Sequence, residues 1–207
     1  LAGDNPGPLS EGAVRQVGSQ RDLYERPADR FVAGFVGRST FLEGTIEAPG
    51  AVALVAFTSG STGTPKANPK TWAALRISTA QNAEALRHLW PECGVLPLVA
   101  TVPPQHMYGM ELSVLLPLLA PVSVHGGRPF FPEDVVRAVR TAVDPPLLVT
   151  TPVHLRALVE SAIELPPLAG IVTATAPLPQ SLAAAAEQRF GCEVRELFGS
   201  TETCVIA

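Results

Sequence analysis

Cysteine, long apolar runs and clusters of basic residues are all scarce in this chain of 207 residues. The three cysteines, Cys93, Cys192 and Cys204, are far apart and form no CxxC pair, which excludes a disulfide framework and a zinc site of the usual spacing. No run of 18 apolar residues occurs, so no membrane-spanning helix is expected. A net charge of −4 without any Lys/Arg block is unsuited to binding nucleic acid or an anionic membrane surface.

Targeting signals are also missing from the sequence. Its first residues carry neither a basic segment nor an apolar one, so no secretory signal is expected. Together with the isolated cysteines, this predicts a reducing, cytoplasmic location. The chain does not begin with Met and stops at Ala207 directly after a motif, and we therefore expect both ends to be cuts.

The composition is that of a folded protein. Hydrophobic residues make up 46% of the chain and charged residues 16%, which is enough to build a core and excludes wholesale disorder. The 17 glycines and 21 prolines make the chain rich in turns, yet below the roughly 25–30% of low-complexity sequence. The length corresponds to one domain with an appendage, or to part of one large domain.

From residue 51 onward, short apolar runs alternate with amphipathic segments. This alternation predicts βαβ units and a doubly wound parallel sheet, so the expected fold class is α/β. The expected strands are the apolar runs 51–57, 95–102, 122–125, 146–150, 169–174 and 192–198. The expected helices are the stretches 72–89, 107–119, 132–142, 152–162 and 179–190.

The most specific motif is the segment Phe57–Lys66, which reads F-T-S-G-S-T-G-T-P-K. It follows an expected strand and precedes an expected helix. Glycines let backbone N–H groups turn inward, hydroxyls donate to anionic oxygens, and the final lysine adds a positive charge, so the segment has the chemistry of a phosphate-binding loop. The alternative, a Ser/Thr/Gly linker, does not account for its place between a buried strand and a helix or for its Pro-Lys end.

This loop is not a Walker A motif, which requires Gly, four residues and then Gly-Lys-Ser/Thr. Counting from Gly60 puts Pro65 at the position of the second glycine, and Lys66 is followed by Ala67. The hydroxyl that would bind magnesium is therefore missing, and a P-loop NTPase is excluded.

The loop instead resembles the signature of acyl- and aryl-adenylate-forming enzymes, read here as T-S-G-S-T-G-T-P-K. Further segments match that family in the right order: Gln105–Gly109 (Q-H-M-Y-G), Thr173–Leu178 (T-A-T-A-P-L) and Leu197–Glu202 (L-F-G-S-T-E). Thr175 departs from the family pattern, because relatives have glycine in that turn. The resemblance covers residues 51–207 and implies the central part of an adenylation domain, with a partial parallel-sheet core.

The family chemistry implied by this resemblance is ATP-dependent activation of a carboxylic acid as acyl-AMP, with transfer to coenzyme A or an acyl carrier protein. ATP and Mg2+ are the implied cofactors, and a small carboxylic acid is the implied substrate. Lys66, Thr201 and Glu202 are the expected catalytic residues, and Glu202 is also the expected metal ligand. The expected nucleotide-binding residues are Thr58, Ser59, Gly60, Ser61, Thr62, Gly63, Thr64, Lys66, Thr175, Ala176, Pro177, Gly199, Ser200 and Thr201.

The segment around His106 is expected to line the acyl pocket. His106, Tyr108 and Gly109 are the candidate pocket residues, with the histidine as a wall or gate for the acyl group. A structural role for a lone histidine is the alternative, since Pro103 and Pro104 before it indicate a tight turn at the end of a strand.

Residues 1–50 have a different pattern. Within them, residues 12–44 resemble the segment of ABC-importer ATPases that follows the nucleotide-binding domain. The pattern predicts a short helix ending at Pro27 and a second helix with Phe31, Val32, Phe35 and Val36 on its apolar face. The expected organisation is thus a short helical N-terminal appendage (1–50) and a truncated adenylation domain (51–207).

Two functions remain open at this point. The first is an adenylate-forming acid–thiol ligase that lacks its C-terminal catalytic part, because the family's ribose-binding motif and C-terminal lysine would lie beyond Ala207. The second is a non-catalytic nucleotide-binding fragment or an ABC-transport accessory segment.

Overall fold

The computed structural model describes residues 9–10, 13–14, 50–57, 66–91 and 94–205. The chain divides into two units, Leu1–Glu43 and Gly44–Ala207. The described residues of the first unit form one antiparallel pair of short strands, β1 (Leu9–Ser10) and β2 (Ala13–Val14). The helices expected around Pro27 and Phe31 lie outside the described residues.

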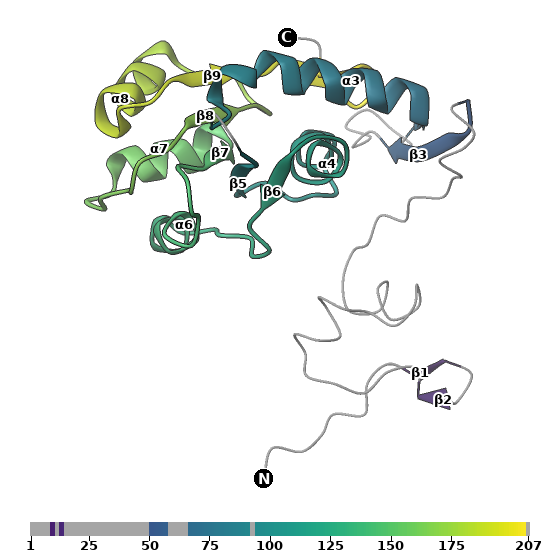
Figure 1. Cartoon of the computed structure of the whole chain (residues 1–207), viewed down its shortest axis with the longest axis horizontal. Coiled ribbons are helices and arrows are strands. Elements are labelled where there is room, and N and C mark those ends of the chain that lie inside the picture. The colour runs from purple at the N-terminus through teal and green to yellow at the C-terminus, as the bar shows by residue number, and fades with distance from the viewer. Residues whose placement is uncertain (1–8, 11–12, 15–49, 58–65, 92–93, 206–207) are drawn as a thin grey trace. The chain divides into compact units, whose positions relative to one another are not determined.

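The second unit is built on a parallel sheet of five strands in the order β6-β5-β7-β8-β9 (Figure 1). All four pairings between neighbouring strands are parallel, as the alternation of strands and helices predicts. The strands are β5 (Leu96–Ala100), β6 (Val122–Val124), β7 (Leu147–Thr150), β8 (Gly170–Thr173) and β9 (Val194–Glu196).

Helices cover both faces of this sheet, and local signals mark the start of α3 and the end of α8. Thr71 caps α3 by accepting the N–H of Ala74 at 3.2 Å, and Gly191 ends α8 in a left-handed conformation. One face carries α3 (Trp72–Ala85), the 3-10 turn η1 (Arg87–Leu89), α4 (Met107–Met110), the π-helical turn η2 (Glu111–Leu115) and α5 (Leu116–Leu119). The other carries α6 (Pro132–Val139), α7 (Pro152–Glu160) and α8 (Gln180–Phe190).

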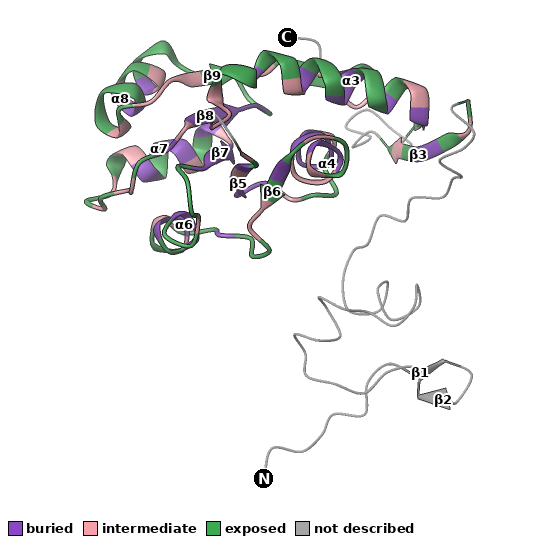
Figure 2. Ribbon diagram, viewed as in Figure 1, coloured by how far each residue is buried: buried purple, intermediate pink, exposed green. Residues whose placement is uncertain are grey.

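The core therefore consists of two layers, one on each side of the sheet (Figure 2). Successive residues of β7 alternate between them: Leu147 and Val149 pack toward α4 and α5, whereas Leu148 packs toward α6, α7 and α8. All three are fully buried. Every strand of the interior of the sheet is thus apolar on both faces, which explains the continuous apolar runs in the sequence.

The first expected strand has a different partner from the one the sequence pattern suggests. β3 (Val52–Phe57) pairs antiparallel with β4 (Ala67–Thr71) in a separate two-stranded sheet. The residues of β4 contain Pro69 and little apolar surface, so no strand is expected there from sequence. Proline is tolerated because β4, within the described residues, pairs with β3 alone and is therefore an edge strand. A small core of Leu54, Trp72 and Leu115, among others, joins the ribbon to α3 and η2.

Candidate active site

Three of the four motifs follow parallel strands of the five-stranded sheet. His106 follows β5, Thr175 follows β8 and Gly199 follows β9. The chain passes from β5 to β6 on one side and then returns to β7 on the other side of β5. Ligands of open α/β sheets bind at the carboxyl edge, next to such a reversal of strand order. The sheet therefore brings these motifs to the edge where a ligand is expected.

A row of buried threonines marks the same edge. Thr101, Thr150 and Thr173 stand at the carboxyl ends of β5, β7 and β8, and none is more than 2% exposed. The hydroxyls of Thr101 and Thr150 are hydrogen-bonded at 2.9 Å. That of Thr173 has no partner among the described residues. Sequence reasoning missed this row, although three expected strands share the signal of a threonine directly after the apolar residues.

The candidate acyl-pocket residues lie at the start of α4. His106 is exposed, whereas Tyr108 and Gly109 are buried. The hydroxyl of Tyr108 donates to the carbonyl oxygen of Val172 at 2.9 Å, and burial raises the pKa of this phenol well above its ordinary value. The N–H of His106 donates to the carbonyl of Pro103 at 3.2 Å, which forms the tight turn expected from the two prolines.

Thr175 occupies the turn after β8 with φ at +81°, a left-handed conformation that favours glycine. Thr175, Ala176 and Pro177 are all exposed. The turn is attached to the neighbouring strand because Glu196 Oε1 accepts the N–H of Leu178 at 2.9 Å. A threonine thus adopts a backbone conformation that favours glycine, at the position where the resemblance implies one.

The last motif forms a short hairpin between β10 (Gly199–Ser200) and β11 (Cys204–Val205). Ser200 Oγ accepts the N–H groups of Glu202 at 3.2 Å and Thr203 at 3.3 Å, which shapes the turn. The side chain of Glu202 is exposed. Its pKa lies below the ordinary value, chiefly through the hydrogen bond with Ser200 and further through the charges of Lys70 and Lys66. Glu202 is therefore a carboxylate at neutral pH.

The phosphate-loop residues 58–64 lie outside the described residues, but the strands on either side are described. They show that the loop connects β3 to β4 across an antiparallel ribbon. Lys66, just before β4, is exposed, and its charge contributes to the low pKa of Glu202. Lys70, in β4, donates through Nζ to the carbonyl oxygen of Glu202. The end of the loop and the turn that carries Glu202 are therefore neighbours, although 132 residues separate Lys70 from Glu202.

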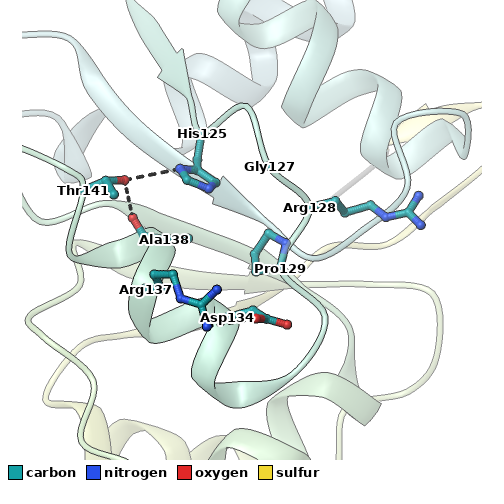
Figure 3. Close-up of a pocket in the computed structure, with 8 residues that line it drawn as sticks. All are labelled: His125, Gly127, Arg128, Pro129, Asp134, Arg137, Ala138 and Thr141. Atoms are coloured by element: carbon teal, nitrogen blue, oxygen red, sulfur yellow. Dashed lines mark hydrogen bonds and ion pairs between the residues drawn. The ribbon is translucent and has the colours of Figure 1, made fainter. Parts of the chain in front are cut away.

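A pocket of about 380 Å³ lies at the end of β6, beside α6 (Figure 3). Its side chains come from residues 125–141, a different part of the chain from the motifs. The Asp134 carboxylate accepts the N–H of Phe131 at 3.2 Å and pairs with Arg137 at 3.6 Å. The lining of this pocket therefore combines the negative charge of Asp134 with the positive charges of Arg128 and Arg137.

Two further observations limit the chemistry of the described residues. Within them, no three His, Cys, Asp or Glu side chains gather as a metal-binding cluster. The longest helix among them, α3, has 14 residues, fewer than the roughly 20 that cross a bilayer, and none qualifies as a membrane span.

Known proteins resemble this chain both in sequence and in fold. Residues 10–207 match the family model described as AMP-binding enzyme. The 4-coumarate–CoA ligase of Rhodobacter capsulatus is 34% identical over 151 residues, which are 70% of this chain and 36% of that protein. The structure of a malonyl-CoA ligase ternary product complex, with methylmalonyl-CoA and AMP bound, is 27% identical with a TM-score of 0.59. That match covers 76% of this chain and 35% of the ligase chain.

A second similarity is short. The spermidine/putrescine import ATP-binding protein PotA of Ruegeria pomeroyi is 62% identical over 34 residues, which are 16% of this chain and 9% of that protein. The chain thus spans 36% of the curated ligase and a far smaller share of the transporter ATPase.

Proposed function

Because the chain belongs to the AMP-binding enzyme family, we propose that it binds ATP and takes part in activating a carboxylic acid as an acyl adenylate. In this reaction a carboxylate oxygen attacks the α-phosphorus of ATP. The bond from that phosphorus to the pyrophosphate oxygen breaks, and acyl-AMP and pyrophosphate form. A thiol of coenzyme A or of an acyl carrier protein then displaces AMP to give a thioester. The substrate is a small carboxylic acid, and the reaction belongs in the cytoplasm.

The observation that carries this proposal is the approach of the end of the phosphate loop to the Glu202 turn. Two anions, a carboxylate and a triphosphate, must meet during adenylation, so the site has to neutralise charge and hold the partners in line. Lys66 supplies positive charge on one side, and Glu202 supplies an ionised oxygen on the other. This combination suits a nucleotide bound together with a cation.

The residues then divide the work by their chemistry. The loop 58–64 and Lys66 bind the β- and γ-phosphates, and Thr201 donates to the α-phosphate. Thr175, Ala176 and Pro177 contact the adenine, while Gly199 and Ser200 shape the backbone beside it. His106 borders the acyl group, with Tyr108 and Gly109 behind it.

Glu202 also fits a magnesium ion. Mg2+ prefers oxygen ligands and is usually bound through one or two carboxylates plus substrate phosphates. An exposed carboxylate with a lowered pKa meets this requirement without a protein-only cage. The ion supplies charge neutralisation for the triphosphate, and Glu202 would hold it there.

The first fifty residues are a separate part of the proposal. The short similarity to PotA supports their origin as an ABC-importer-type segment, followed by an adenylation part over 51–207. It also supports the alternative function, a nucleotide-binding fragment or transport accessory segment without catalysis. A carboxylate-dependent exchange of pyrophosphate into ATP separates the two, since only adenylation makes that exchange possible.

Calorimetric titration of the chain with Mg2+–ATP tests the binding step. We expect the titration to give saturable heat. The double substitution Lys66→Ala, Glu202→Gln should lower the affinity for Mg2+–ATP at least about tenfold, since hydrogen bonds to charged groups are among the stronger ones. The matched control is Arg76→Ala with Glu84→Gln, two exposed charges on α3 outside the motifs. No heat from the unsubstituted chain, or equal losses in both double variants, would contradict the proposal.

A further inference from the structure

A cluster of polar and charged side chains is buried beneath the turn that carries Glu202. Glu111 is 1% exposed, and Lys70 and Ser78 are each 8% exposed. Lysine and glutamate are rarely buried so deeply, because removing a charge from water is costly unless the charge is paired and hydrogen-bonded. None of the three belongs to a motif of the sequence. Favourable contacts of these side chains must therefore offset the cost of burying them.

The contacts of this cluster reach the hairpin of β10 and β11 at two points. Glu111 accepts hydrogen bonds from the hydroxyl of Ser78 and, through Oε2, from the N–H of Val205 at 3.0 Å. Lys70 donates to the carbonyl oxygen of Glu202. Glu111 thus holds the backbone at Val205. Lys70 holds the backbone at Glu202, the proposed metal ligand. The charge of Lys70 also stabilises the ionised form of Glu111.

The turn needs such restraint because its backbone is strained. Cys204 has φ at +65°, although it is not a glycine. A left-handed residue of this kind persists only where its surroundings fix it, and such residues gather at functional sites. Cys204 stands between Glu202 and Val205, the two residues that the cluster holds. The strain and the restraint therefore fall on the same four residues, 202–205.

Two of the three side chains, those of Lys70 and Glu111, also lie within a few residues of different motifs. Lys70 lies in β4, directly after the phosphate loop, and Ser78 lies in α3. Glu111 begins the π-helical turn η2, two residues after Gly109 of the pocket motif. Single π-helical turns are uncommon and are often found at functional sites. The cluster thus joins β4, α3 and η2 to the turn that carries Glu202.

We infer that Lys70 and Glu111 are positioning residues, which fix the turn of Thr201 and Glu202 so that it can bind a magnesium–nucleotide complex. This inference rests on the function proposed above. Neither side chain touches the ligand itself. Both act through the backbone of residues 202–205, and Ser78 holds Glu111 in place.

The test measures the affinity of the full chain for Mg2+–ATP after removal of each charge. We expect Lys70→Met and Glu111→Gln each to weaken binding about tenfold, because each removes a charge from the cluster and weakens or removes the hydrogen bond that this charged group makes to the turn. The double substitution should weaken binding by about as much as either single one, since the residues act on one turn as a unit. Lys70→Arg keeps the charge and a donor, and we expect it to retain most of the affinity.

The control is Arg189→Met. Arg189 is another long cation that donates to backbone carbonyls, those of Val159, Ser161 and Ile163, away from the motifs. We expect it to lower the melting temperature without changing the affinity. If the charge variants do not fold, Ser78→Ala removes one hydrogen bond and no charge, and we expect a loss of about threefold. Unchanged affinity in folded Lys70→Met and Glu111→Gln, or in Ser78→Ala, would overturn the inference.

Hydrogen exchange of the segment 199–205 provides a readout that does not need a ligand. We expect faster exchange there in Lys70→Met and Glu111→Gln than in the unsubstituted chain, and no change in Arg189→Met. If the unsubstituted chain does not bind Mg2+–ATP, the proposed function fails, and hydrogen exchange alone decides the inference. Exchange in this segment that is the same in all variants would then overturn it.

Discussion

The hydroxyl of Tyr108 donates a hydrogen bond to the carbonyl oxygen of Val172, 2.9 Å away, in the interior of the protein. This bond connects α4, which carries the pocket motif, to β8, which leads into the Thr175 turn. Tyr108 is 8% exposed and Val172 is fully buried. The two motifs are therefore coupled through the core as well as through any ligand that binds between them.

Tyr108→Phe should destabilise the fold by about 1–2 kcal/mol, because it removes a buried donor and leaves the carbonyl of Val172 without that partner. Urea unfolding followed by circular dichroism measures this free energy. His106→Ala, a change at a nearby exposed residue, should alter stability by less than about 0.5 kcal/mol. Equal stability of the two variants would show that the bond contributes nothing.

Gly109→Ala should destabilise the fold by about 3 kcal/mol, at the upper end of the usual cost of overpacking. A Cβ at this position would overlap the carbonyl oxygen of Pro103 and lie 2.8 Å from its carbonyl carbon, and backbone cannot move aside as a side chain can. Gly126→Ala is the control, since a Cβ there has no atom within 4 Å. Calorimetric melting would compare the two, and a Gly109→Ala melting temperature as high as that of Gly126→Ala would refute the expectation.

Thr175→Gly should stabilise the fold by about 1 kcal/mol. Relief of the left-handed strain returns roughly 1–3 kcal/mol, and the greater freedom of glycine in the unfolded chain offsets part of that gain. Ala176→Gly is the control: among the described non-glycine residues only Thr175 and Cys204 have a positive φ, so glycine relieves no strain at position 176. It should destabilise by about 0.4–1 kcal/mol. Changes of the same sign in both variants, measured by urea unfolding, would contradict this account.

The stability of the protein should depend on pH through Glu111. Burial raises the pKa of this carboxyl above 4.5, although the hydrogen bonds from Ser78 and Val205 and the charge of Lys70 act in the opposite direction. A group with a raised pKa in the folded state binds its proton more tightly there. Its contribution to stability is therefore complete below the unfolded-state pKa and is lost as pH rises through the folded-state pKa.

Urea unfolding at pH 4.5, 6 and 7.5 tests this prediction against Glu111→Gln, which cannot ionise at that position. We expect the free energy of unfolding of the unsubstituted protein, relative to the variant, to fall as pH rises. A difference that stays constant or grows with pH would mean that the favourable contacts outweigh burial.

The sequence by itself determined most of the α/β architecture. Apolar runs separated by amphipathic segments predicted the strands of the parallel sheet, and the observed β7 and β8 lie within the expected runs 146–150 and 169–174. Once the strands are parallel, their carboxyl ends share one edge, so the order of the motifs after them predicts which side chains can meet. Strand periodicity and loop chemistry are local properties, and local sequence records them.

Only the tertiary structure decided how β4 and the buried charges are placed. The residues of β4 have no strand pattern, and they form a strand because β3 pairs with them across the loop. Lys70 and Glu111 look like solvent-exposed charges in the sequence, yet both are buried. Their burial depends on contacts such as that between Lys70 and Glu202, 132 residues apart. A charge can leave water only where its partners are brought to it, and the folded chain alone supplies those partners.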